Sequence, residues 1–311
     1  MGLSTGAVRA SILRLAHHRS VRSLVTGTRP GRAVATRFVA GETLADAMSV
    51  ARDLSDVGLL SMLNLLGEDV EEPEQALRVR ESYLSALDAS AAAPDIDPAV
   101  SVKLTQLGLD DSIEACWANL RPIVVSAEDR GSLLMIDMES HRYVDATLEL
   151  AARAHAAYPR VGVAIQAALR RSETDVFALA PGTRIRLVKG AYLEPEDVAF
   201  TTKREVDANF SRLFATVFAR GHPVDVATHD PKLIEGVRAR VDGVEGGWGR
   251  VEFQMLYGVR RDLQSQLAGR DLPVRVYIPY GTEWYPYLTR RLAERPANVW
   301  FFVSNLVRTS R

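Results

Sequence analysis

Two adjacent arginines near the end of the chain stand at a spacing that suits anion binding. Tyr287, Arg290, Arg291 and Glu294 occupy positions i, i+3, i+4 and i+7, so in a helix they share or flank one face. Guanidinium groups bind carboxylates through paired hydrogen bonds, so the two arginines predict a site for a small carboxylate. The alternative is a solvated helix face, where Arg–Arg pairs are common.

Charged residues also interrupt apolar runs that are typical of buried β-strands. In residues 101–105 the alternation of a strand places Ser101, Lys103 and Thr105 on one face, and Asp137 and Arg186 interrupt two further runs. A buried ammonium needs an anion nearby, and a buried carboxylate and guanidinium are tolerated most easily as a pair. We therefore predict that Asp137 and Arg186 meet and that Lys103 points into the same cavity. The alternative for Lys103 is a purely structural ion pair.

Other polar residues and a glycine follow predicted strands. Gln166 could hydrogen-bond to the edge of a heterocycle, and Gly190 would allow a ligand to approach the backbone closely. Thr228 and His229 precede a predicted helix that begins near Pro231, a position suited to a ribityl or pyrophosphate group.

The remaining reactive residue types give little sign of a metal or redox site. The one cysteine, Cys116, lies in a helical pattern and is interpreted as a buried structural thiol. His17 and His18 are adjacent, and no other two of the six histidines stand at ligand spacing, so no metal site is expected.

These residues must be positioned by a sheet, because short apolar runs alternate with amphipathic segments from about residue 59 onward. Eight strand–helix repeats over about 240 residues predict an α/β fold, a (β/α)₈ TIM-like barrel with its chemistry at the C-terminal strand ends. The rival is a doubly wound open sheet, but no G-x-G-x-x-G motif follows a strand. The predicted strands are residues 59–66, 100–105, 133–138, 161–166, 184–189, 224–228, 251–255 and 274–279.

Helical spacing between these strands gives the outer layer of the predicted barrel. The domain division that follows is an N-terminal helical arm over residues 1–58 and the barrel over residues 59–311. The clearest helical patterns cover residues 74–91, 112–127, 144–157, 206–220 and 231–241.

Charge and hydropathy restrict the partners of the protein. The net charge of −1 offers no basic excess for a nucleic acid, and no run of 18 apolar residues could span a membrane. The first 40 residues hold seven arginines and no acid before Glu42, which is typical of a basic bacterial arm, the interpretation we favour. A mitochondrial transit peptide and a helix resting on an anionic membrane surface remain alternatives.

Several motifs, in order along the chain, resemble those of proline dehydrogenases of the monofunctional bacterial type. The most specific are R-L-V-K-G-A-Y at residues 186–192 and Y-x-P-x-G followed by Y-L-x-R-R-L-x-E within residues 277–294. The resemblance covers roughly residues 36–305. It implies non-covalent FAD and oxidation of L-proline to Δ1-pyrroline-5-carboxylate, with electrons passed to a membrane quinone. It also implies a cytoplasmic enzyme with peripheral contact to the inner face of the cell membrane, or the matrix side in a mitochondrion.

The resemblance also implies a role for each matching residue. Asp137 and Arg186 would be the catalytic pair, with Arg186 also beside the reactive flavin nitrogen. Lys103, Arg290 and Arg291 would bind the proline carboxylate, and Glu294 would brace the arginines. Leu256, Tyr277 and Tyr287 would shape the substrate pocket. The cofactor contacts would be Met138, Gln166, Lys189, Gly190, Ala191, Thr228, His229 and Gln254.

Two other functions are compatible with lysines at barrel strand ends. A Schiff-base aldolase would use Lys103 or Lys189 as its nucleophile. A non-catalytic amino-acid-binding barrel would hold proline without a flavin.

Overall fold

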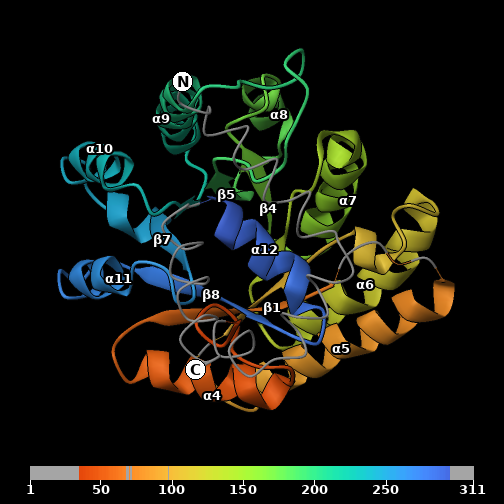
Figure 1. Cartoon of the computed structure of the whole chain (residues 1–311). Helices are drawn as coiled ribbons and strands as arrows, with labels where there is room; N and C mark the ends of the chain where they lie inside the picture. The colour runs from red at the N-terminus through yellow and green to blue at the C-terminus, as the bar shows by residue number, and fades with distance from the viewer. Residues whose placement is uncertain (1–34, 68–69, 71, 97, 295–311) are drawn as a thin grey trace, which may run out of the picture.

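The core of the molecule is a closed barrel of eight parallel strands, in which each strand pairs with the next and β8 pairs with β1 (Figure 1). The computed structural model describes residues 35–67, 70, 72–96 and 98–294, apart from the side chains of Arg290 and residues 292–294. The predicted (β/α)₈ barrel is confirmed. The strands are β1 (Leu60–Leu65), β2 (Ala99–Val102), β3 (Leu134–Ile136), β4 (Val161–Gln166), β5 (Arg184–Val188), β6 (Val224–Ala227), β7 (Val251–Leu256) and β8 (Val274–Tyr280).

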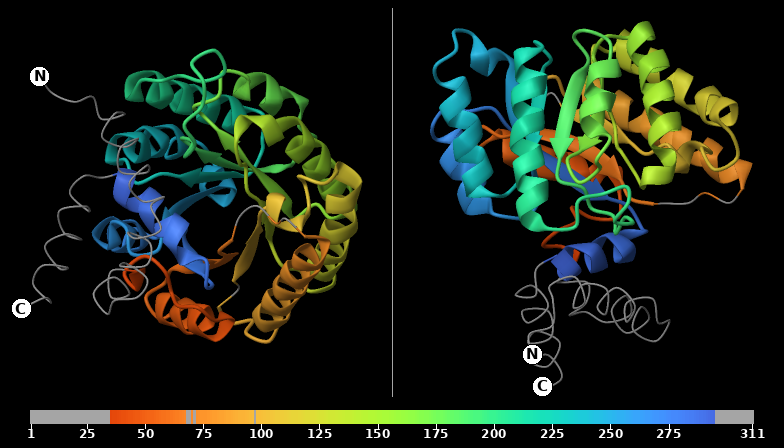
Figure 2. Two further views of the ribbon diagram at one scale, coloured as in Figure 1. Left: turned by 45° about the vertical axis from the view of Figure 1, so that its right-hand side comes forward. Right: turned by 90° about the horizontal axis from the view of Figure 1, so that it is seen from above.

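Helices surround the barrel as an outer layer, which Figure 2 shows in its left-hand view. The α-helices are α4 (Leu44–Ser55), α5 (Pro73–Ala91), α6 (Ile113–Asp129), α7 (Val144–Ala157), α8 (Ser172–Ala178), α9 (Lys203–Ala219), α10 (Pro231–Val241), α11 (Arg261–Ala268) and α12 (Trp284–Glu294). Short 3₁₀ helices are η1 (Thr105–Leu107), η2 (His141–Tyr143) and η3 (Gly247–Arg250).

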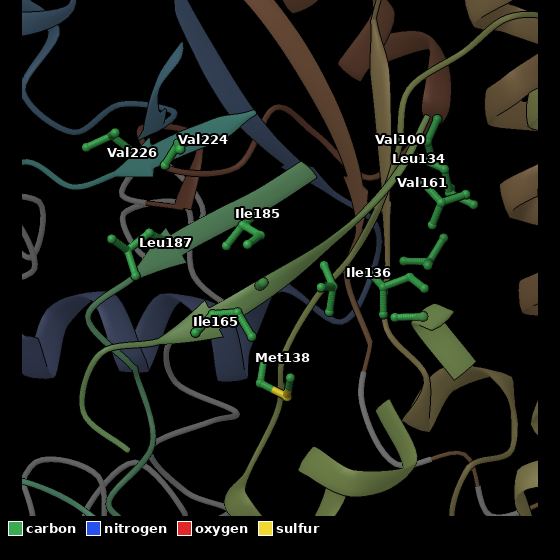
Figure 3. Close-up of a cluster of buried hydrophobic side chains, with 14 of the residues drawn as sticks. Val100, Leu134, Ile136, Met138, Val161, Ile165, Ile185, Leu187, Val224 and Val226 are labelled. Carbon is green, nitrogen blue, oxygen red and sulfur yellow. The ribbon is translucent and has the colours of Figure 1, made fainter. Parts of the chain in front are cut away.

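Branched aliphatic side chains on the outer face of the barrel form the main core (Figure 3). In β5, Ile185 and Leu187 are fully buried in this core, so the alternation of the strand turns Arg184 and Arg186 toward the barrel interior. A slip of one residue would place both arginines in the apolar helix layer, and this cost fixes the register. The core therefore determines which charged residues reach the site.

Two helices depart from a regular strand–helix alternation. The helix that precedes the first strand, α4, lies outside the seam between β1 and β8, and its residues Ala47, Met48 and Ala51 join the main core. The last helix, α12, instead lies across one end of the barrel, as the right-hand view of Figure 2 shows. Since α12 follows β8 directly, that end is the C-terminal mouth, where the polar strand ends gather.

Two predicted strands end two or three residues earlier than expected. The predicted strand over residues 100–105 leaves the sheet after Val102, because the backbone N–H and hydroxyl of Thr105 donate to the Glu139 carboxylate, at 3.1 and 2.7 Å. Thr105 consequently begins η1 and does not continue the inward face with Lys103. The strand predicted over residues 133–138 is likewise shortened to β3.

The start of the last helix was also predicted incorrectly. The helical spacing in the sequence begins at Tyr287, whereas α12 begins at Trp284 and includes Pro286. Proline is tolerated there because the backbone N–H groups of a first helical turn have no partner within the helix.

Most of the predicted N-terminal arm, residues 1–34, lies outside the described residues. Within the part of the chain that is described, no helix is long and apolar enough to cross a membrane.

Candidate active site

Asp137 lies at the centre of a hydrogen-bonded cluster inside the C-terminal mouth of the barrel. Its Oδ1 accepts from Arg186 Nη1 at 2.5 Å and from Ser101 Oγ at 2.7 Å. Its Oδ2 accepts from Lys103 Nζ at 3.0 Å and from the Tyr277 hydroxyl at 2.7 Å. The predicted meeting of Asp137 and Arg186 is confirmed, and Lys103 pairs with the same carboxylate.

The charges around Asp137 keep it ionised. Burial alone would raise its pKa, but the positive charges of Lys103 and Arg186, with hydrogen bonds from Ser101 and Tyr277, hold the pKa at about 2. The carboxylate therefore stays an acceptor at any physiological pH.

Lys103 is buried and has all three of its N–H donors in use. Besides Asp137, it donates to Asn64 Oδ1 at 2.9 Å and to the Tyr277 hydroxyl at 3.3 Å. Burial lowers the pKa of its ammonium, but Asp137 together with Tyr83 and Glu139 more than offsets this, so the pKa lies above its ordinary value. An amine nucleophile needs the opposite shift, so Lys103 is a poor Schiff-base residue.

Tyr277 of β8 covers this group of charges. Its ring centroid lies 5.4 Å from Arg186 Cζ and 6.0 Å from Lys103 Nζ. Burial and the Asp137 carboxylate raise the pKa of Tyr277 well above its ordinary value, so the phenol remains a donor.

A second set of polar atoms lies at the end of β4, the strand that pairs with β5 and so with Arg186. Gln166 Nε2 donates to the Glu139 carbonyl at 2.6 Å, whereas its buried Oε1 has no hydrogen-bond partner. Beside it stands Gly190, whose φ is +109°, and a Cβ there would lie 3.0 Å from that oxygen. A buried acceptor beside bare backbone suits the N–H edge of a flat heterocycle, so these residues fit an isoalloxazine ring.

The predicted contacts to the rest of the cofactor lie on adjacent strand ends. His229 Nε2 accepts the backbone N–H of Leu256 at 3.0 Å, which joins the ends of β6 and β7, and Thr228 Oγ1 accepts the N–H of Asp230. Lys189 is ion-paired with Asp207 at 2.5 Å and with Asp230 at 3.0 Å. A phosphate on Lys189 would have to compete with these two carboxylates.

The helix α12 supplies the predicted substrate residues from above the mouth. Tyr287 is buried, and Arg291 Cζ lies 5.3 Å from the centroid of its ring. The Tyr287 phenol also contributes, after the larger causes, to the raised pKa of Tyr277. The side chains of Arg290 and Glu294 lie outside the described residues.

Two residues complete the Asp137 cluster that the sequence did not assign to the site. Asn64 was not predicted at all, and Ser101 was predicted to point inward but was given no role. The signal for Asn64 was its position: it is a polar residue in an apolar strand, and it lies two residues after Met62 on the same inward face. Met138, predicted to contact the cofactor, packs in the main core (Figure 3). Among the described residues, no group of three or more His, Cys, Asp or Glu side chains could hold a metal ion.

Comparison with known proteins assigns this site to a family. Residues 47–303 match the family model described as Proline dehydrogenase. The chain belongs to the proline dehydrogenase family. It is 39% identical over 281 residues to the Proline dehydrogenase of Deinococcus radiodurans, covering 88% of this chain and 90% of that protein. It is 36% identical to Proline dehydrogenase 1 of Bacillus subtilis, covering 91% of this chain and 92% of the relative.

Solved structures agree at the level of the fold. The proline utilization A protein of Bdellovibrio bacteriovorus, inactivated by N-propargylglycine, superposes with a TM-score of 0.79 at 24% identity. The match covers 94% of this chain and 35% of that longer one. Membership of the proline dehydrogenase family makes the chain an oxidoreductase of proline catabolism, so the aldolase and the non-catalytic barrel are both wrong.

Proposed function

We propose that the protein uses non-covalent FAD to oxidise L-proline to Δ1-pyrroline-5-carboxylate and passes the electrons to a membrane quinone. The observation that carries the proposal is the unpartnered Gln166 Oε1 beside Gly190. Gln166 lies two residues beyond Ala164, the register partner of Arg186, so a ring at Gln166 would lie next to the Asp137 cluster.

The proposed contacts to the cofactor's ring, ribityl and phosphate groups lie at the ends of three neighbouring strands, β4, β5 and β6. When bound, FAD would supply the hydride acceptor. Gln166 and Gly190 would hold the ring edge, and Thr228 and His229, before the N-terminus of α10, would hold the ribityl and phosphate part. The remaining proposed contacts are Met138, Arg186, Lys189, Ala191 and Gln254.

The substrate would lie between the barrel and α12. We propose that Lys103, Arg290 and Arg291 bind the proline carboxylate, with Glu294 bracing the arginines. Since the donors of Lys103 are all used, the carboxylate would replace its longest contact, the 3.3 Å bond to the Tyr277 hydroxyl. Leu256, Tyr277 and Tyr287 would close around the apolar ring.

The cationic surroundings would favour the reactive protonation state of proline. Hydride leaves C5 most easily when the lone pair of the ring nitrogen is available to form the C=N bond. Several cations around the carboxylate disfavour a further positive charge on the nitrogen. Asp137 and Arg186 are the proposed catalytic pair: Arg186 places a positive charge beside the electron acceptor, and Asp137 holds that guanidinium in place.

The colour of the purified protein tests this proposal. We expect a yellow protein whose flavin absorption bleaches when L-proline is added without oxygen, with release of Δ1-pyrroline-5-carboxylate. Arg186→Met should lower the rate of bleaching strongly. A colourless protein that turns over proline, or an Arg186→Met variant with normal turnover and flavin spectrum, would refute the cofactor or the assignment of Arg186.

We further propose a cytoplasmic enzyme whose basic arm contacts the inner face of the cell membrane to reach the quinone. Deleting residues 1–34 should reduce quinone-dependent turnover while leaving turnover with a soluble dye unchanged. The deletion stops before Ala35, which is buried against α12. Equal loss of both activities would contradict a role for the arm at the membrane.

A further inference from the structure

The guanidinium of Arg186 is fixed by contacts on every side. Nη1 donates to Asp137 and, at 3.2 Å, to Ser101 Oγ, and Nη2 contacts the Met62 sulfur. Nε donates to Gln254 Oε1 at 2.7 Å. The Nε bond to Gln254 anchors a different nitrogen from the one that binds Asp137, so the two contacts together restrain the guanidinium plane.

The amide of Gln254 can satisfy Arg186 in only one of its two orientations. Its oxygen must face Arg186, because the NH₂ group would place donor against donor. On the other side, Gln254 Nε2 donates to Glu252 Oε1 at 3.0 Å. An ionised carboxylate only accepts, so Glu252 makes the flipped amide unfavourable at both ends.

Glu252 is itself held rigidly. Arg275 Nε and Nη2 donate to its two carboxylate oxygens at 2.8 and 3.1 Å, and Arg275 Nη1 donates to the Ser61 carbonyl at 2.9 Å. Burial raises the pKa of Glu252, but Arg275 and the Gln254 amide outweigh this and lower the pKa below its ordinary value. Exposure is 8% for Glu252, 4% for Gln254 and 6% for Arg275, so water does not compete for these bonds.

We propose that Glu252 is a positioning residue for proline oxidation, which through Gln254 sets the orientation of the Arg186 guanidinium. Glu252 lies one inward position before Gln254 on β7, further from the C-terminal mouth where the substrate and the cofactor would bind. This inference rests on the proposed role of Arg186 beside the electron acceptor. It makes Arg275, Glu252, Gln254 and Arg186 one chain of contacts through the barrel interior.

The test compares Glu252→Gln with Gln254→Met in anaerobic flavin reduction by proline. A glutamine at position 252 can donate as well as accept, so it no longer selects the Gln254 orientation. We expect the limiting rate of reduction to fall about tenfold in each variant, with the KM for proline within about twofold of wild type. In the double variant the loss should match that of Gln254→Met alone, because both changes break the same path.

A matched control is Asp225→Asn, in the same buried layer. Asp225 Oδ1 pairs with Arg184, and its buried Oδ2 has no hydrogen-bond partner among the described residues, so Asp225 lies outside the hydrogen bonds that join Glu252 to Arg186. It should lose thermal stability while keeping its limiting reduction rate within about twofold of wild type. Because Glu252→Gln leaves Arg275 without its carboxylate, Glu252→Gln/Arg275→Met is measured as well, and it should show the same loss of rate.

Three results would overturn the proposal. These are a wild-type limiting rate in Glu252→Gln or in Glu252→Gln/Arg275→Met, additive losses in the Glu252/Gln254 double variant, and an equal loss of rate in Asp225→Asn. Failure of the proposed function is seen separately, in the wild-type protein, as the absence of a proline-reducible flavin.

Discussion

At the scale of single residues, the site stabilises buried charges through mutual pairing, and Asp137 is the acceptor that they share. Replacing it with asparagine leaves Lys103 and Arg186 buried without a counter-charge. We expect Asp137→Asn to lower the free energy of unfolding by about 3 kcal/mol at pH 7, measured by urea denaturation. The control is Asp88→Asn, because Asp88 is mostly exposed in its pair with Arg130 and should change stability by under about 0.5 kcal/mol.

The same pairing predicts a pH dependence. The pKa of Asp137 is held at about 2 in the folded state, whereas an unfolded aspartate titrates near about 3.9. A depressed pKa contributes stability above the unfolded value and loses it as the pH falls. The difference between wild type and Asp137→Asn should therefore shrink between about pH 4 and pH 2. A constant difference across that range would show that Asp137 is not held ionised by its neighbours.

The single thiol gives a second prediction at this scale. Cys116 is fully buried, and burial with the nearby Glu139 charge raises its pKa to about 12. Because the thiolate is the reactive form, iodoacetamide should label the native protein negligibly at pH 8 and label it fully after denaturation. Rapid labelling of folded protein, measured by mass spectrometry, would mean that α6 opens far more readily than its packing indicates.

The sequence predicted the charged residues of the site better than their polar partners. Lys103, Asp137 and Arg186 could be found because an unpaired charge in an apolar strand is costly, so each implied the others. Asn64 carries no charge, and a single amide in a strand has many possible partners. Its role depends on Lys103 reaching across from β2, which only the closed barrel determines.

At the scale of elements, the turn after β5 shapes the proposed cofactor cavity. Gly190 has a φ of +109°, and an added Cβ would lie 3.0 Å from both Gln166 Oε1 and Ala168 Cβ. Gly190→Ala should therefore weaken FAD binding by about tenfold, because strain is added where the ring would approach. Titration of apoprotein with FAD, followed by fluorescence, measures this.

Gly182 gives a matched control for that substitution. Its φ is +82°, yet a Cβ there would meet nothing within 4 Å. Gly182→Ala should cost a similar amount of stability, about 1 kcal/mol, while leaving FAD affinity unchanged. If both variants bound FAD with wild-type affinity, the cavity beside Gln166 would not be the flavin site.

Element boundaries were predictable only where the local pattern decides them. The helix over residues 144–157 and that over residues 231–241 were predicted with the bounds that the structure has. Strand β2 was predicted too long because apolar alternation continues through Leu104, whereas the strand is ended by Glu139, 34 residues away from Thr105. A distant carboxylate that captures a backbone N–H leaves no signal in the local sequence.

At the scale of the whole molecule, the two ends of the described chain meet at the barrel mouth. Residues 35–39 pack against α12 in one apolar cluster, which contains Ala35, Phe38, Val39, Leu66, Trp284, Tyr285, Tyr287 and Leu288. The Ala40 N–H donates to the Pro279 carbonyl at 2.9 Å, and the Gly281 N–H donates to the Gly41 carbonyl at 3.0 Å. The N-terminal segment thus supports the helix that carries Arg290 and Arg291.

This arrangement predicts that a residue outside the proposed site controls substrate affinity. Phe38 is 3% exposed, and Phe38→Ala should lower the free energy of unfolding by about 3 kcal/mol. The substitution also removes apolar contacts that hold α12 against the barrel. The KM for proline should rise about tenfold, equal to about 1.4 kcal/mol of binding, while the limiting rate of flavin reduction stays near wild type. Phe214→Ala is the matched control, because Phe214 is as deeply buried but stacks on Phe218 in the outer helix α9. It should lose comparable stability without a change in KM, and an equal rise in KM in both variants would show that the effect is general loosening of the fold.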